Sequence, residues 1–293
     1  MRTMGKYDEA QRFYTQALEK SVDHDILTSA KCTHGLSGVH FLKGNYDEGI
    51  SSILKTISLY EQLPNNDSDI AQCHRNLGCL YMRKKNHKLA RKYMETALHA
   101  YRTIHGEDHS ETALMNLNLG ALTTETKEYD QAEVYCKQAL KSFEKIFHAD
   151  HRYIALAYCN IGVIYCCLKQ YDLSLHYYQK QLEIQQRTIP ADSFEFGIAY
   201  LNMGEVYEER GEYDQALSYY GKASENFRNA ALLPENGAMI ELNQHIKSTN
   251  EKKNLLFATS IFRKRFLRTV AKTIILTLCV LIIIYWSFLN YNK

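Results

Sequence analysis

The sequence has 293 residues, of which 23% are charged, and its length leaves room for two compact domains. Its net charge is +2, but five basic residues between positions 263 and 272 supply +5, so the remainder carries −3. This balance makes nucleic acid a poor partner. Eight cysteines form no C-x-x-C pair, and the chain opens without a secretory signal, so we expect reduced thiols buried in helices of a cytosolic domain.

The chain opens with a predicted amphipathic helix over residues 4–22, where Tyr7, Ala10 and Ala17 share one face. The same pattern returns about every 42 residues as the second of two helices, and its opening residues are Tyr7, Tyr46, His87, Tyr129, Tyr171 and Tyr213. Residues 1–25 therefore read as an incomplete repeat with a second helix only. We favour a truncated sequence, and a fragment of a longer chain or an edge closed by a partner stays open.

Residues 26–230 divide into five repeats of two helices each, which favour one elongated domain. A small residue marks each first helix, at Ser37, Gly78, Gly120, Gly162 and Gly204, in steps of 41, 42, 42 and 42. A larger side chain there would push the two helices of a hairpin apart. Short polar residues precede four of the first helices and are predicted N-caps: Asn66, Asp108, Asp150 and Asp192. This periodicity predicts an all-α, right-handed solenoid of helical hairpins.

The recurring pattern of small and aromatic residues, seen in Gly120, Tyr129, Ala132 and Ala139, resembles that of tetratricopeptide repeats. The usual repeat is about 34 residues long. The longer step, the Asn-Leu-Gly of residues 118–120 and the Gly-Glu-Asp-His of residues 106–109 are similar to the kinesin-light-chain type. The resemblance covers roughly residues 4–230. It implies a concave groove lined by the first helices, in which extended peptides bind.

The C-terminal part changes in character. We predict a closing helix over residues 236–254, a basic juxtamembrane segment over 255–272 and a single transmembrane helix over 273–289. The last of these is an uncharged apolar run of 17 residues, and the basic residues before it include Arg263, Lys264, Arg265 and Arg268. Because the basic residues lie before the apolar run, we predict a tail-anchored protein with its repeats facing the cytosol, in the endoplasmic reticulum or the mitochondrial outer membrane. The alternative is a buried helix docked on the solenoid end.

An asparagine stands two residues before each repeat glycine, at Asn76, Asn118, Asn160 and Asn202. The resemblance places these residues in the groove, where they hold a peptide backbone. An amide group offers both donors and an acceptor, so a ladder of four can bond a main chain without reading its sequence. The alternative is that each asparagine bonds a neighbouring helix and stiffens the array. Both uses satisfy the same polar group.

Charged residues near this ladder bear on specificity. Members of the family that bind chaperones clamp a terminal carboxylate with several basic residues, whereas here only Arg75 is basic. Glu205 and Glu208 make the last repeat acidic. We therefore expect a basic or neutral peptide segment rather than a C-terminal carboxylate.

The sequence shows no nucleophile elbow, P-loop, dinucleotide fingerprint or zinc-protease motif, so we expect no enzymatic activity and no cofactor. His105 and His109 lie in a repeat turn, and we expect no metal there. The predicted function is a membrane-anchored scaffold for protein or peptide partners. The alternatives are the C-terminal part of a larger enzyme or motor adaptor, and a module that self-associates through its unpaired first helix.

Overall fold

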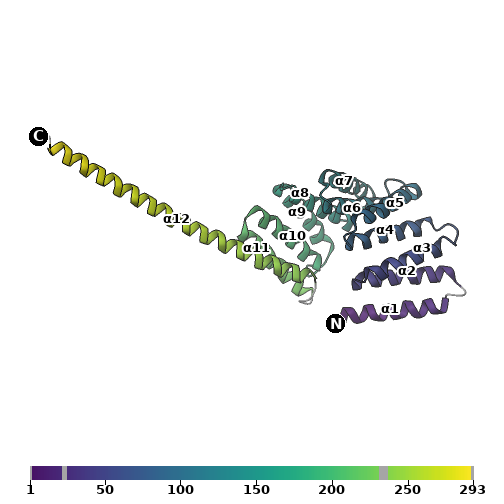
Figure 1. Cartoon of the computed structure of the whole chain (residues 1–293). Coiled ribbons are helices and arrows are strands. Elements are labelled where there is room, and N and C mark those ends of the chain that lie inside the picture. Colours follow the sequence, from purple (N-terminus) through teal and green to yellow (C-terminus); the bar gives the residue numbers. More distant parts are fainter. Residues whose placement is uncertain (1, 22–24, 231–236, 292–293) are drawn as a thin grey trace. The chain divides into compact units, whose positions relative to one another are not determined.

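The computed structural model describes the backbone of residues 2–21, 25–230 and 237–291, and the side chains of residues 6–21, 25–230 and 237–267. Within these ranges the secondary structure is helical throughout (Figure 1). Contacts group the chain into two compact units, Met1–Ala191 and Asp192–Lys293. The boundary between Ala191 and Asp192 falls between two of the predicted repeats rather than inside one.

The first unit begins with a single helix, α1 (Arg2–Ser21), and continues with four helical hairpins. The hairpins are α2 (Ile26–Lys43) with α3 (Tyr46–Tyr60), α4 (Asp67–Arg83) with α5 (His87–His105), α6 (Ser110–Glu125) with α7 (Tyr129–Ile146), and α8 (Arg152–Cys167) with α9 (Tyr171–Thr188). Each second helix packs against the first helix of its own hairpin and, up to α8, against the first helix of the next. The predicted aromatic marks Tyr46, His87, Tyr129 and Tyr171 are the first residues of their helices.

Each hairpin turns through one residue in the left-handed region. The residue is Lys127 in the α6–α7 turn, with a φ of 65°. The Lys127 amide donates to the Thr124 carbonyl at 3.0 Å, and the Glu128 amide donates to the Thr123 carbonyl at 2.8 Å. This pair of bonds is the Schellman motif, which satisfies the last carbonyls of a helix. The equivalent residues in the other turns are Gly44, Lys85, Lys169 and Gly211.

The repeat glycines lie where the two helices of a hairpin come closest. A Cβ atom on Gly78 would lie 2.5 Å from Met94 Cγ, and one on Gly162 would lie 2.7 Å from the Tyr178 ring. A Cβ atom on Gly120 would overlap Cys136 Sγ. A larger residue at these positions therefore requires the facing side chain or its helix to shift, which gives a packing reason for the repeated glycine.

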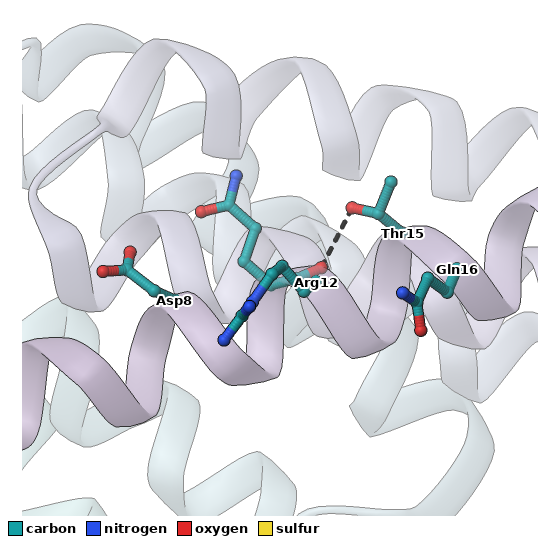
Figure 2. A pocket seen from close by; sticks show the side chains of 5 residues that line it. Asp8, Arg12, Thr15 and Gln16 are labelled. Atoms are coloured by element: carbon teal, nitrogen blue, oxygen red, sulfur yellow. Dashed lines mark hydrogen bonds between the residues drawn. The ribbon is translucent and has the colours of Figure 1, made fainter.

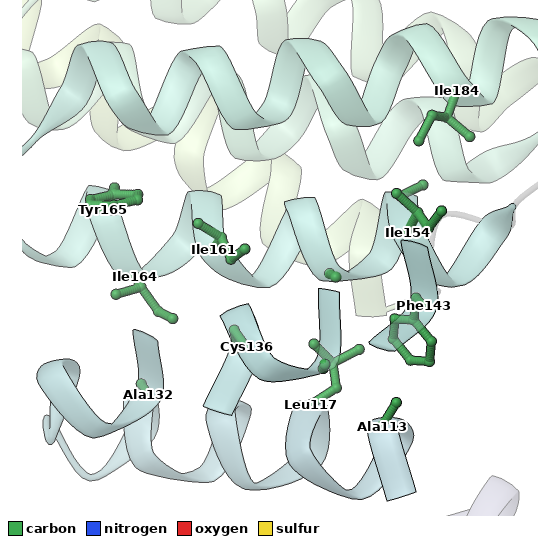
Figure 3. Close-up of a cluster of buried hydrophobic side chains, with 13 residues drawn as sticks. Ala113, Leu117, Ala132, Cys136, Phe143, Ile154, Ile161, Ile164, Tyr165 and Ile184 are labelled. Atoms are coloured by element: carbon green, nitrogen blue, oxygen red, sulfur yellow. The ribbon is translucent and has the colours of Figure 1, made fainter. Parts of the chain in front are cut away.

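Stacked aromatic pairs also pack between the first and second helices of a hairpin. Tyr81 stacks on Tyr93 with centroids 5.5 Å apart, and Tyr165 stacks on Tyr177 at the same separation. Figure 3 shows a cluster of buried side chains formed by α6 to α9. Its members include Leu117 of α6, Cys136 and Phe143 of α7, and Ile161 of α8. These contacts bury apolar side chains both within a hairpin and between the α6–α7 and α8–α9 hairpins.

The predicted aspartate caps are wrong by one residue. The N-cap of α6 is His109, that of α8 is His151 and that of α10 is Ser193. The displaced aspartates instead bind cations on the following second helix: Asp108 pairs with Lys145 and Asp150 with Arg187, each at 2.7 Å. A helix amide and a nearby cation compete for the same carboxylate, and here the cation binds it. Asn66 is the N-cap of α4, but its side chain makes no capping hydrogen bond.

The second unit contains α10 (Phe194–Arg210), α11 (Tyr213–Asn229) and α12 (Gly237–Tyr291). The predicted closing helix and the segments after it are one continuous helix, because no glycine or proline lies between residues 238 and 291 to end it. Among the described residues, no helix combines the length and apolar character needed to cross a bilayer. The run predicted at 273–289 and the side chain of Arg268 lie outside the residues whose side chains are described.

Candidate functional site

The predicted asparagine ladder begins with a bond between neighbouring hairpins. Asn76 Nδ2 on α4 lies 2.7 Å from His34 Nε2 on α2. Burial lowers the pKa of His34, which favours the neutral ring that can accept this hydrogen bond. Asn76 therefore links two first helices, as expected if the asparagines stiffen the array rather than bind a peptide. Arg75, its neighbour, is half-buried.

The next two asparagines are arranged differently. Asn118 Nδ2 on α6 lies 3.9 Å from Met115 Sδ, and Asn160 Nδ2 on α8 donates to the Leu156 carbonyl at 3.1 Å. Both contacts stay within the asparagine's own helix. In the part of the chain that the structure describes, the side-chain oxygen of each amide has no hydrogen-bond partner. Both residues are half-buried, and their helices contact each other directly.

The surroundings of Asn118 and Asn160 are small and mostly apolar. The half-buried side chains within two turns include Ala121, Thr124 and Val163. Thr124 Oγ1 donates to the Gly120 carbonyl at 2.8 Å, so this hydroxyl is already engaged with its own helix. The face between α6 and α8 thus presents two amides on a neutral background.

In the second unit, the predicted site residues Asn202, Gly204, Glu205 and Glu208 all lie on α10. A Cβ atom on Gly204 would overlap the Tyr220 ring of α11. Glu208 is buried, with 7% of its surface exposed, and its carboxylate accepts hydrogen bonds from three residues. These are Tyr220 Oη at 2.6 Å, His245 Nδ1 at 3.1 Å and Lys252 Nζ at 2.7 Å.

The donors around Glu208 come partly from α12, which packs on α10 and α11. Burial alone raises the pKa of Glu208, but the hydrogen bonds from Lys252, Tyr220 and His245 bring it down to about 2. His245 Nε2 also lies 3.2 Å from Glu205 Oε1. Burial raises the pKa of Glu205 to about 7. The two glutamates that we expected beside a peptide therefore hold the closing helix in this structure.

Sequence reasoning missed His245 and Lys252 as the partners of these glutamates. They are seven residues apart and share one face of α12, and this spacing was the available signal. Among the described residues, Glu205, Glu241 and His245 have ligand atoms within 4.8 Å of one another, as a metal site requires. Because the imidazole of His245 is shared between Glu205 and Glu208, we interpret the group as an ion-pair network.

The remaining predicted residues have structural positions. Tyr129 packs against the cluster formed by α6 to α9, and Tyr213 begins α11. Arg263, Lys264 and Arg265 are exposed on α12. An open hollow lies along α1 and is lined by Asp8, Gln11, Arg12, Thr15 and Gln16 (Figure 2). The hollow contains no member of the asparagine ladder, and Lys43 of α2 binds Asp8 at its edge at 2.7 Å.

Comparison with known proteins agrees with this architecture. The family model described as "Tetratricopeptide repeat" matches residues 29–103, 80–145, 111–187 and 153–229. A search of curated proteins gives no match. BtubC (BKLC) from P. vanneervenii is similar in structure, with a TM-score of 0.65 and 19% identity over 78% of this chain and 94% of that one.

Two further structures share the fold. A Rap protein complexed with Competence and Sporulation Factor has a TM-score of 0.63 and 16% identity, over 87% of this chain and 75% of its own. A kinesin-light-chain-like protein of Podosopora anserina, with nearly identical repeats, has a TM-score of 0.56 and 11% identity, over 69% of this chain and 95% of its own. The chain therefore belongs to the tetratricopeptide repeat family.

Proposed function

We propose that this chain is a non-enzymatic scaffold that binds peptide segments of other proteins along the first helices of its hairpins. The observation that carries the proposal is the pair Asn118 and Asn160. They occupy the same position of two helices in contact, and each directs its amide NH₂ group into its own helix. Their carbonyl oxygens thus remain available to accept hydrogen bonds from a peptide main chain.

The kind of peptide follows from the residues around the two amides. Ala121 and Val163 are apolar and half-buried, and the acidic residues of the last repeat bind α12. We therefore propose a neutral, mildly apolar segment bound through its backbone. The similar fold of the Rap protein, whose structure is a complex with Competence and Sporulation Factor, supports the use of such a scaffold for binding.

A peptide-display selection on the purified chain provides a ligand for the test. The affinity of a selected peptide is then measured for the wild type, for the double variant Asn118→Ala with Asn160→Ala, and for Asn76→Ala. Each lost hydrogen bond costs about 1 kcal/mol, so we expect the double variant to bind roughly 30-fold more weakly. Asn76→Ala, whose amide bonds His34, should lower stability with a smaller effect on binding.

The opposite pattern would overturn the proposal. Unchanged affinity in the double variant, with unfolding shifted to lower denaturant, would mean that the two amides are structural. Circular dichroism of each variant shows whether the helices are retained.

We also propose that residues 273–289 anchor the scaffold in a membrane, with the repeats on the cytosolic side. The support is the sequence: an uncharged apolar run of 17 residues follows a basic segment. Alkaline extraction of membranes that contain the full chain tests this. The full chain should resist extraction, whereas a chain that ends at Lys272 should be extracted; release of both would contradict the anchor.

A further inference from the structure

The face of the first helices that carries Asn118 and Asn160 also carries an exposed leucine. Leu156 of α8 stands one turn before Asn160 and is 44% exposed. The helices α4, α6 and α8 are described in full, and no other large apolar residue on them is exposed. A single exposed leucine is ordinary on a protein surface, so the residues around it decide whether it marks a site.

Three residues form a line along one face of α8. Leu156, Asn160 and Val163 stand at positions i, i+4 and i+7, so their directions around the helix lie within about 60° of one another. The corresponding residues of α6 stand 42 positions earlier: Leu114, Asn118 and Ala121. The line in α6 therefore has the same order of residue types, which is a leucine, an amide and a smaller apolar residue.

The two lines together make three rows across the helices, because α6 and α8 contact each other directly. The leucine row consists of Leu114 and Leu156, the amide row of Asn118 and Asn160, and the small row of Ala121 and Val163. Along each helix the leucine row lies about 6 Å from the amide row, and the small row lies about 4.5 Å on its other side. Leu114 is half-buried and packs against the cluster formed by α6 to α9, whereas Leu156 is exposed. Leu156 is therefore the most prominent apolar group beside the two amides.

The three rows carry no charge. Residues 114–121 and 156–163 contain no acidic or basic side chain. Charged groups stand nearer the helix ends and are engaged there: Glu125 pairs with Lys85 and His87, and the Arg152 guanidinium carbon lies 5.8 Å from the centroid of the Tyr153 ring. A charged group placed on Leu156 would lose water without gaining a partner. The rows therefore favour uncharged, apolar side chains.

A peptide that is bound through its main chain presents its side chains to the two outer rows. Successive side chains of an extended chain point to opposite sides of the backbone. When the backbone follows the amide row from α6 to α8, alternate side chains therefore lie over the leucine row and over the small row. On α8, the side chain on the leucine side meets Leu156.

We propose that Leu156 selects a large apolar side chain, such as leucine, isoleucine or phenylalanine, at one position of the bound peptide. The partner is thus an extended, uncharged segment that carries this side chain next to the residue bonded to Asn160. This inference rests on the proposed function, because the amide row holds the peptide beside Leu156. The two amides bind main-chain groups that every peptide has, so Leu156 supplies the dependence on sequence.

Parallel peptide-display selections test this assignment. They use the full chain, its Leu156→Glu variant and its Leu173→Glu variant. Leu173 is the matched control, because it is 43% exposed but lies on α9, the second helix of the same hairpin. We expect peptides selected on the wild type and on Leu173→Glu to share an apolar residue at one position. Peptides selected on Leu156→Glu should carry lysine or arginine at that position, since a glutamate there attracts a cation.

The affinity of one peptide selected on the wild type gives the size of the contact. Leu156→Ala should weaken binding about five- to tenfold, as expected when the exposed part of a leucine becomes buried, and Leu173→Ala should leave the affinity unchanged. Leu156→Glu should weaken binding further, and a peptide with lysine at the selected position should restore much of the loss. Such a rescue distinguishes a direct contact from a loss of folding.

The same measurements separate this assignment from the proposed function. If Asn118→Ala with Asn160→Ala lowers the affinity, but the Leu156 variants keep it and all three selections give the same sequences, the role of Leu156 is wrong and the amide row stands. If the affinity depends on neither the two amides nor Leu156, both proposals fail. Selection of a charged residue by the wild type at the position that responds to Leu156 would also overturn the proposal.

Discussion

Lys252 Nζ lies 2.7 Å from Glu208 Oε1, and this ion pair joins α12 to α10 across 44 residues of sequence. Only 6% of the Glu208 side chain is exposed, so the charge is held by its hydrogen bonds rather than by water. The closing helix thus caps the last repeat through a buried charge as well as through apolar contacts.

Replacement of Glu208 tests this interaction. Hydrogen bonds to charged groups contribute about 1.5–3 kcal/mol, so we expect Glu208→Gln to lower the free energy of unfolding by about 2 kcal/mol. Glu212→Gln is the control, because it removes an exposed pair with Arg210 and should cost under about 1 kcal/mol. Urea denaturation followed by circular dichroism gives both values. Equal effects of the two changes would contradict the assigned role of Glu208.

The two glutamates of α10 also predict the pH dependence of the second unit. The pKa of Glu208 falls from 4.5 to about 2 on folding, so its contribution is present above about pH 4.5 and is lost as the pH falls toward 2. The pKa of Glu205 rises from 4.5 to about 7, so its contribution is present below pH 4.5 and is lost as the pH rises through 7.

We therefore expect Glu205→Gln to gain stability relative to the wild type as the pH rises from 5 to 8, the window set by the pKa of about 7. Because 35% of the Glu205 side chain is exposed, water will reduce the size of the effect. Melting temperatures of both proteins across this range give the difference directly. A difference that does not depend on pH would show that the Glu205 carboxyl group is not perturbed.

A pair of glycine substitutions tests the packing of the hairpins. Gly120→Ala adds a methyl group that overlaps Cys136 Sγ, and we expect a net loss of about 1–2 kcal/mol. Gly38 lies inside α2, and a Cβ atom added there would have no other atom within 4 Å, so Gly38→Ala should gain up to about 1 kcal/mol from helix propensity. The denaturation midpoint should fall for Gly120→Ala and rise for Gly38→Ala. If both midpoints moved in the same direction, close packing would not explain the glycine at position 120.

The turn residues allow a reciprocal test. Lys169 has a φ of 60° and Gly211, at the same position of the next repeat, has a φ of 83°. The left-handed conformation costs a side-chain-bearing residue about 1–2 kcal/mol, partly offset by the flexibility of glycine in the unfolded chain. We expect Lys169→Gly to raise the melting temperature and Gly211→Lys to lower it. Identical shifts would show that the turn conformation does not limit stability.

The repeat pattern could be predicted well because its signals are local or strictly periodic. A glycine such as Gly120, recurring every 42 residues inside a helix, has few explanations other than close packing. The turn at Lys127 was not predicted, because a lysine does not indicate a left-handed backbone; Gly44 and Gly211 at the same position were the available hint. The cap expected at Asp108 is displaced because Lys145, 37 residues later, competes for its carboxylate.

The second unit is harder to predict because its contacts join distant segments. The spacing of His245 and Lys252 places them on one face of α12, but nothing in the sequence indicates that this face meets Glu205 and Glu208 of α10. The change in composition at residue 255 suggests a boundary, yet α12 continues through it. Composition alone does not end a helix; glycine or proline does, and none follows Gly237.

The most direct test of the scaffold is hydrogen–deuterium exchange of the full chain with and without a peptide obtained by selection. If the first helices bind the peptide, protection should increase on α6 and α8, at residues 110–125 and 152–167. The partner helices α7 and α9 should change little. Protection centred on α7 and α9, or binding without protection of either first helix, would contradict the account.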